Sequence, residues 1–226
     1  MTQPSTPRAK SFLRRALPEP ILRAIRVYRE LDATGRASLP RVWLRRLFAR
    51  RQQLPSLPAS PNVLFVCRGN ILRSAVAQAM FQRLTLTDNG NRVGVVASAG
   101  TAAADGTMAD PRGLRVASQL GFDLSGHRAQ LLRKAAVDQA DLILVMDYLN
   151  EAEVLGQYPA AASKVRLLGT FGSNHHRPRE IMDPYSGTEE DVRQAFLVIS
   201  TAVRHLATHL SLSPPPSPGN SHTGTG

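Results

Sequence analysis

Apolar residues along the chain fall into short runs that alternate with longer segments of helical periodicity. Four runs have the length and apolar content of buried strands, at 63–66, 92–97, 141–146 and 164–168. Three segments repeat their apolar residues at helical spacing, at 75–84, 111–120 and 189–210. Strands that alternate with helices predict a parallel sheet covered by helices on both faces. We therefore predict that residues 61–210 form one doubly wound α/β domain with a four-stranded sheet.

The two ends of the chain differ from this central domain. Residues 1–60 form a basic extension with two short amphipathic helix candidates, at 21–31 and 41–51. Prolines and serines between 55 and 61 predict a linker to the domain. The tail, 211–226, is rich in Pro, Ser, Gly and Thr and is expected to be disordered.

The net charge of +11 is concentrated in the N-terminal extension. This part carries 12 Arg and 1 Lys against 3 acidic residues, so the remaining chain is nearly balanced. Two interpretations of the extension stay open. Residues 11–51 could lie on an anionic membrane surface, or the two helices could pack on the domain and leave their arginines in solvent. Nucleic acid is the least favoured partner, because aromatic residues that stack on bases are few.

The chain has a single cysteine, Cys67, in 226 residues. One thiol excludes an internal disulfide and favours a reducing environment. The N-terminus lacks an apolar stretch of signal-peptide length, and no run of 18 apolar residues occurs. We therefore expect a soluble cytoplasmic protein, or one that lies peripherally on the inner membrane surface.

Cys67 opens a stretch with the composition of an anion-binding loop. It directly follows the first predicted strand, and the next seven residues are Arg68, Gly69, Asn70, Ile71, Leu72, Arg73 and Ser74. Backbone N–H groups in a loop that leads into a helix favour both a thiolate and a phosphate. Gly69 allows close approach of the backbone, and Asn70 tolerates the left-handed conformation of tight loops. The planar fork of Arg73 can hold two oxygens of a tetrahedral anion, and Ser74 can donate a hydrogen bond to the sulfur.

Cleavage of a phosphate ester also needs a proton for the departing oxygen. The sequence Asp183-Pro184-Tyr185 lies on a predicted loop before the last helix, so Asp183 is the candidate acid. The competing interpretation is an ordinary turn, where an Asp before a proline is common. Tyr185 is predicted either to line the rim of the substrate pocket or to be a surface aromatic residue.

These motifs make residues 62–210 similar to low-molecular-weight protein tyrosine phosphatases. The family's loop reads Cys-x-Gly-Asn-x-Cys-Arg-Ser, and its matches here are Cys67, Gly69, Asn70, Arg73 and Ser74. The family's Asp-Pro-Tyr matches 183–185, and further matches lie at 98–101, 110–112, 126–128 and 141–147. The resemblance implies a flavodoxin-like fold and hydrolysis of a phosphate monoester without metal or cofactor.

The resemblance also implies a mechanism and a class of substrate. Cys67 attacks phosphorus and forms a phosphocysteine, while Arg73 holds the transferred phosphoryl group. Asp183 first protonates the leaving oxygen and then deprotonates the water that hydrolyses the intermediate. The substrate implied is a phosphotyrosine protein, and a bacterial tyrosine kinase of an exopolysaccharide pathway is a candidate.

Other residues receive supporting roles from the same resemblance. The substrate-binding residues implied are Arg68, Gly69, Asn70, Ile71, Leu72, Ser74 and Tyr185. Ser98 and His127 are expected to hold Asn70 in a supporting network. No residue is assigned to a metal.

Some positions depart from the family pattern. Leu72 stands where the family has its second cysteine, so the internal disulfide that protects the nucleophile from oxidation cannot form. Ala104 stands where many bacterial members have Trp, and Ser186 replaces a second tyrosine after Asp-Pro-Tyr. With one aromatic wall missing, tyrosine-phosphate hydrolysis is a weaker expectation than phosphate-monoester hydrolysis.

Two other functions share this loop. One is arsenate reduction that depends on a small thiol cofactor, since a single cysteine excludes an internal cysteine relay. The other is a non-catalytic module that binds an anion or acts as a scaffold. The joint presence of Cys67, Arg73 and Asp183 disfavours the second alternative, because a binding module does not need the acid.

Overall fold

The computed structural model describes residues 28–29, 31–48, 54–87, 93–172 and 180–212. Within this part of the chain, four parallel strands form one sheet in the order β2-β1-β3-β4. The strands are β1 (Val63–Cys67), β2 (Val96–Gly100), β3 (Leu142–Val145) and β4 (Val165–Leu167). Every residue of β1 and β3 is buried, as expected for central strands of a sheet that is covered on both faces.

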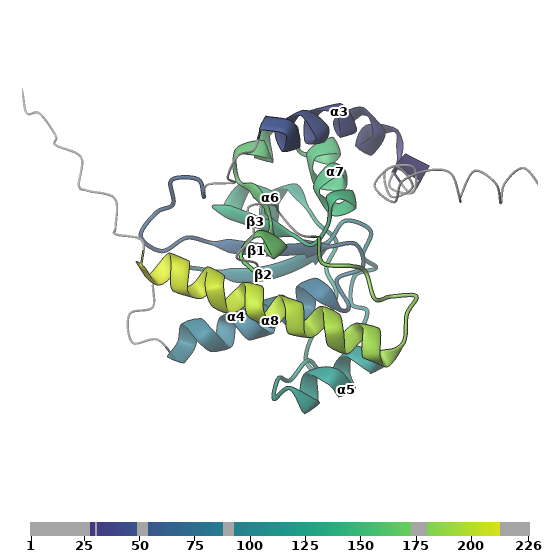
Figure 1. Ribbon diagram of the computed structural model, residues 1–226, viewed down its shortest axis with the longest axis vertical. Helices are drawn as coiled ribbons and strands as arrows, with labels where there is room; N and C mark the ends of the chain where they lie inside the picture. Colours follow the sequence, from purple (N-terminus) through teal and green to yellow (C-terminus); the bar gives the residue numbers. More distant parts are fainter. Residues whose placement is uncertain (1–27, 30, 49–53, 88–92, 173–179, 213–226) are drawn as a thin grey trace, which may run out of the picture.

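Helices cover the two faces of the sheet (Figure 1). One face carries α4 (Arg73–Thr87), α5 (Pro111–Gln119) and α8 (Glu189–Leu212). The other face carries α3 (Ala33–Phe48), α6 (Lys134–Gln139) and α7 (Tyr148–Gln157). Two short 3-10 helices, η1 (Pro159–Ser163) and η2 (Leu168–Thr170), flank β4. The predicted doubly wound α/β fold with a four-stranded parallel sheet is confirmed.

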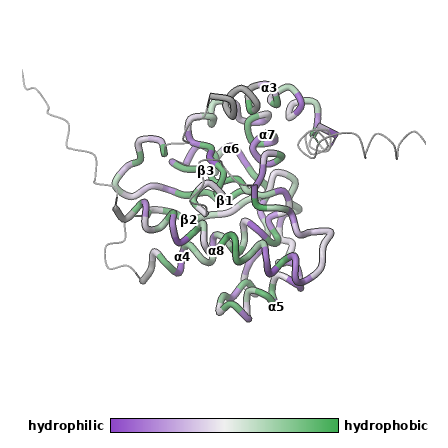
Figure 2. Tube along the Cα trace, in the orientation of Figure 1, coloured by the Kyte–Doolittle hydropathy of each residue, from purple (hydrophilic) through white to green (hydrophobic). Residues whose placement is uncertain are grey.

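Alternate residues of the central strands belong to two separate hydrophobic cores, one on each face of the sheet. Phe65 and Leu144 point to the side of α4 and α8, and the rings of Phe65 and Phe81 meet edge to face with centroids 5.6 Å apart. Leu64 and Ile143 point to the other side and pack with residues of α3 and α7. Figure 2 shows hydrophobic and polar residues interspersed along α8, whose buried residues belong to the first of these cores. The sheet is thus fixed from both sides, and its carboxyl edge becomes a rigid base for the loops.

The second strand differs from its prediction. We expected it at 92–97, ending before Ser98, whereas β2 runs from Val96 to Gly100. The prediction followed β-branched residues, but pairing with β1 sets the register, and Cys67 pairs with Gly100. Small residues are needed here, because a Cβ on Gly100 would lie 2.5 Å from the carbonyl oxygen of Arg68. The strand's small residues therefore let the loop after β1 lie directly on β2.

Two helices between the predicted strands were missed, α6 and α7. The second N-terminal helix exists but is longer than predicted, since α3 begins at Ala33 and contains Pro40. It packs on the domain through buried Val42, and Leu31, which precedes the helix, is buried in the same cluster. For this helix, the packing agrees with one of the two interpretations of the extension. The first helix candidate lies mostly outside the described residues, as does the tail at 213–226. Among the described residues, no helix combines the length and apolar character needed to cross a membrane.

Candidate active site

The loop between β1 and α4 surrounds the sulfur of Cys67. Asn70 adopts φ of +53°, the left-handed conformation that its residue type tolerates. This turn directs the backbone N–H of Asn70 to the Cys67 sulfur at 3.3 Å, and the Ser74 hydroxyl lies 3.0 Å from the same atom. Helix α4 begins at Arg73, so its positive N-terminal end also faces this loop. The surroundings of the sulfur therefore stabilise a thiolate.

The side chain of Asn70 is fully buried and holds the loop together. Its Nδ2 donates to the hydroxyls of Ser74 at 2.8 Å and Ser98 at 2.9 Å, and its Oδ1 accepts from the backbone N–H of Gln130 at 2.8 Å. Because Ser74 accepts from Asn70, its own proton is available for the sulfur. The structure thus brings together the loop residues and Ser98 that were proposed from sequence.

His127 contacts the same residue from outside. Its Nε2 lies 2.7 Å from the carbonyl oxygen of Asn70, so this nitrogen carries the hydrogen and donates. Burial lowers the pKa of His127 below its ordinary value, although the Asn70 carbonyl opposes the shift. His127 therefore sits as a neutral imidazole against the loop near neutral pH.

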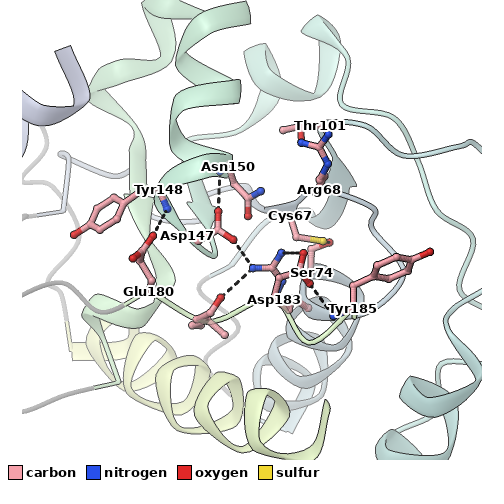
Figure 3. A network of polar contacts seen from close by, with 12 residues as sticks. Cys67, Arg68, Ser74, Thr101, Asp147, Tyr148, Asn150, Glu180, Asp183 and Tyr185 are labelled. Carbon is pink, nitrogen blue, oxygen red and sulfur yellow. Dashed lines mark hydrogen bonds and ion pairs between the residues drawn. The ribbon is translucent and has the colours of Figure 1, made fainter. Parts of the chain in front are cut away.

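Arg73 is the most constrained charged residue of the site, with a side chain only 2% exposed. Its Nη1 donates to Asp147 at 2.5 Å and to the carbonyl oxygen of Ile181 at 3.0 Å, and its Nη2 pairs with Asp183 at 2.7 Å. Burial lowers the pKa of Arg73, but the Asp147 carboxylate leads the opposing interactions and the net pKa lies above the ordinary value. The guanidinium is therefore charged and is fixed in orientation by Asp147 and Asp183, which Figure 3 shows at the site.

Asp183 lies on the loop before α8, close to Arg73. The backbone N–H of Ile181 donates to the carbonyl of Met146 at 2.8 Å, which ties this loop to the end of β3. The Arg112 guanidinium donates to the carbonyl oxygen of Tyr185 at 3.0 Å and so fixes the far side of the loop. Asp183 itself is 43% exposed and faces the pocket. Its position is thus defined by contacts on both sides.

A cavity of about 310 Å³ opens above the sulfur. Tyr185 and Asp183 form one side, as Figure 3 shows, and Ala102 and Ala104 belong to the same lining. The complete lining is Cys67, Arg68, Gly69, Ile71, Leu72, Arg73, Ala102, Ala104, Thr107, Asp183 and Tyr185. In the part of the chain that the structure describes, no group of three His, Cys, Asp or Glu side chains could hold a metal ion.

Two carboxylates of the site were missed by sequence reasoning, and both belong to α7 or its N-cap. Asp147 caps α7 by accepting from the backbone N–H of Asn150 at 2.8 Å, in addition to its contact with Arg73. Glu153, on the next turn of the same helix, accepts hydrogen bonds from Arg68 and Thr101. Burial raises the pKa of Glu153, against the effects of Thr101 and Arg68. An Asp directly after a buried strand and before a helix was the available signal for Asp147.

Comparisons with known proteins agree with this geometry. Residues 62–213 match the family model described as "Low molecular weight phosphotyrosine protein phosphatase". A relative from Ralstonia nicotianae, named "Probable low molecular weight protein-tyrosine-phosphatase EpsP", is 40% identical over 143 residues, which cover 63% of this chain and 90% of that protein.

Solved structures with the same fold include two phosphatases. The tyrosine phosphatase Wzb from Escherichia coli K30, in complex with sulphate, has a TM-score of 0.60 and 30% identity and covers 67% of this chain and 99% of its own. The YwlE arginine phosphatase from Geobacillus stearothermophilus has a TM-score of 0.59 and 31% identity and covers 67% and 93%. With the family match extending over two thirds of the chain, this protein belongs to the low molecular weight phosphotyrosine protein phosphatase family.

Proposed function

We propose that this protein hydrolyses phosphotyrosine in proteins through a phosphocysteine on Cys67. The observation that carries the proposal is the meeting of three groups in one pocket. A sulfur that receives hydrogen bonds and a fixed guanidinium come from one loop, and an exposed carboxyl group comes from a distant loop of the chain. These are the nucleophile, the anion holder and the acid that ester cleavage requires.

In the first step, the Cys67 sulfur attacks phosphorus and the bond to the ester oxygen breaks. The backbone N–H groups of the loop and the guanidinium of Arg73 stabilise the charge on the equatorial oxygens. Asp183 now occupies the Nη2 side of Arg73, so a bound phosphoryl group takes over this side and releases the carboxyl group. Once released, the exposed Asp183 carboxylate takes up a proton from solvent and donates it to the departing oxygen.

In the second step, water displaces the sulfur from phosphorus. Asp183, which has given up its proton, accepts one from the attacking water. The sulfur leaves as a thiolate, which the Ser74 hydroxyl at 3.0 Å and the Asn70 N–H stabilise. Inorganic phosphate then departs, and the resting contacts of Arg73 re-form.

The choice of substrate depends on the walls of the pocket. Tyr185 provides one aromatic side chain, 61% exposed, that can stack on a phenyl ring. Ala102 and Ala104 add little surface to the lining, so a non-aromatic group also fits. Because YwlE is named an arginine phosphatase, phosphoarginine is the second candidate substrate.

Activity measurements on defined substrates test these proposals. We expect the protein to release phosphate from an aryl phosphate and from phosphotyrosine peptides, and Cys67→Ser to abolish turnover. Asp183→Ala should slow turnover by about 10² to 10⁴-fold with a poor leaving group and less with a good one. Equal rates of wild type and Asp183→Ala on poor leaving groups would refute the assignment of the acid. Higher kcat/KM on phosphoarginine than on phosphotyrosine peptides would replace the proposed substrate.

For partner and location, the proposal is a cytoplasmic phosphotyrosine protein, with a tyrosine kinase as the candidate. The basic residues within 11–51 could also bring the protein to an anionic membrane surface. Sedimentation with vesicles that contain anionic lipid tests this part, because replacement of Arg45, Arg46, Arg50 and Arg51 by Gln should reduce the bound fraction. Equal binding by wild type and this variant refutes the membrane proposal.

A further inference from the structure

Helix α3 lies outside the residues that match the family, yet it is packed on a helix that contacts the active site. Figure 1 shows α3 on the outer side of α7, which in turn covers the sheet. We propose that α3 is a positioning element of the active site, which acts through α7 on the two arginines of the phosphate-binding loop.

The contact between α3 and α7 is close and specific. The Ser38 hydroxyl is buried and shares its proton between two carbonyl oxygens, that of Gly35 in its own helix at 2.7 Å and that of Ala152 in α7 at 2.8 Å. Near the start of α3, the backbones of the two helices touch. A Cβ added at Gly156 would lie 2.9 Å from the backbone nitrogen of Gly35 and from the carbonyl carbon of Thr34. These distances leave no room for a side chain at Gly156.

Apolar side chains complete the contact. Leu31 and Val42 are buried on the α3 side, and Ala152 and Leu155 are buried on the α7 side. Helix α7 has only ten residues. Such a short helix depends on tertiary packing for its stability. Its position is therefore set by the sheet on one side and by α3 on the other.

Helix α7 and its N-cap also contact the active site. Asp147, its N-cap, holds Nη1 of Arg73 at 2.5 Å, and Glu153 binds the Arg68 guanidinium. Arg73 lies at the start of α4, and Arg68 directly follows Cys67. Both arginines line the substrate pocket.

A displacement of α7 thus moves the carboxylates that orient both arginines. The strength of a hydrogen bond depends steeply on its geometry, so small shifts of these carboxylates are sufficient to weaken their contacts with the arginines. Errors of about 1 Å in the placement of reacting groups lower rates by about 10²-fold. Loss of the α3 contact should therefore weaken anion binding and turnover while the protein remains folded.

The test uses the full-length chain with Gly156→Ala. Alanine has a higher helix propensity than glycine, so this variant would melt at a higher temperature than the wild type if α3 were not packed against Gly156. With α3 docked as described, the new Cβ pushes the two helices apart and the melting temperature falls. Gly126→Ala is the matched control, because no atom lies within 4 Å of its added Cβ.

Two functional readouts are taken well below the melting temperature. They are kcat/KM on an aryl phosphate and the Kd of inorganic phosphate, and we expect Gly156→Ala to worsen each by about 10-fold. Ser38→Ala is a milder variant that removes one hydrogen bond, and it should change both readouts in the same direction. A lower melting temperature with unchanged kcat/KM and unchanged phosphate affinity would show that α3 only covers α7, and it would overturn the proposal. A higher melting temperature would overturn the docking itself.

A double-mutant cycle tests the route through α7. Asp147→Asn keeps the size of the cap but removes the charge that holds Arg73. If α3 acts through Asp147, then Gly156→Ala should have a smaller effect on phosphate affinity in the Asp147→Asn background than in the wild type. Effects that simply multiply would contradict this route. The turnover readout rests on the proposed function, but the affinity for phosphate does not. An inactive wild type would therefore refute the proposed function, while the phosphate Kd values of the variants would still test the role of α3.

Discussion

Asn70 gives the sharpest test of how the loop is built. Two substitutions, Asn70→Gly and Asn70→Ala, both remove the side chain that bonds to Ser74, Ser98 and the backbone of Gln130. They differ in the backbone, because Asn70 has φ of +53° and only glycine adopts this conformation without strain. The pair therefore separates the contribution of the hydrogen bonds from that of the turn.

The magnitudes follow from the contacts. Three hydrogen bonds at about 1 kcal/mol each give a loss of about 3 kcal/mol for Asn70→Gly. The left-handed conformation adds about 1 kcal/mol for alanine, so Asn70→Ala should lose about 4 kcal/mol. Together these losses are a large part of the stability of an ordinary domain.

The assay is urea-induced unfolding followed by far-ultraviolet circular dichroism, which gives the free energy of unfolding of each variant. We expect the order wild type, Asn70→Gly, Asn70→Ala from most to least stable. Equal values for the two variants would refute the role of the turn. Values for both variants that match the wild type would refute the role of the hydrogen-bond network.

Three further predictions concern the same site. Gly100→Ala should lower kcat/KM by about 10²-fold, because its Cβ would lie 2.5 Å from the backbone of the catalytic loop. Gly126→Ala should not lower kcat/KM, and equal activity of the two variants would contradict the contact at Gly100. Burial depresses the pKa of His127 below 6.5, so the folded state binds fewer protons than the unfolded state. The midpoint of urea unfolding should therefore fall as pH drops below about 6.5, and His127→Gln should flatten this dependence on pH. Parallel slopes for the two proteins would contradict it. Prolonged treatment with excess peroxide, without added thiols, should inactivate the protein by oxidising Cys67 beyond the sulfenic acid, since Leu72 cannot supply a second thiol. Recovery of full activity with dithiothreitol would contradict this.

The sequence was sufficient for the loop and the fold class because these depend on local patterns. Cys67 and Arg73 are separated by a short loop, and a buried run before them and a helix after them are readable without tertiary information. Asp183 was proposed as the acid from Asp-Pro-Tyr, but its contact with Arg73 depends on how the last loop crosses the sheet edge. That contact joins segments far apart in the chain, so spacing alone could not predict it.

The errors have a common physical origin in tertiary contacts. The boundaries of β2 were wrong because pairing with β1 decides which residues form the strand, including the small Ser98 and Gly100. Helix α7 was missed because its ten residues carry a weak local pattern and it is stabilised by packing between the sheet and α3. Glu153 therefore had no visible partner in the sequence, although it binds Arg68 across the fold.

The proposed mechanism requires a phosphoryl group to pass through the sulfur of Cys67. The most direct measurement is rapid acid quench of Asp183→Ala during turnover of an aryl phosphate with a good leaving group, followed by mass spectrometry of the peptides. Without Asp183 to activate water, the intermediate should accumulate. We predict one added phosphoryl group, located on the peptide that contains Cys67 and absent from Cys67→Ser. Phosphate release at the wild-type rate with no modified Cys67 peptide, or a phosphoryl group on another residue, would contradict it.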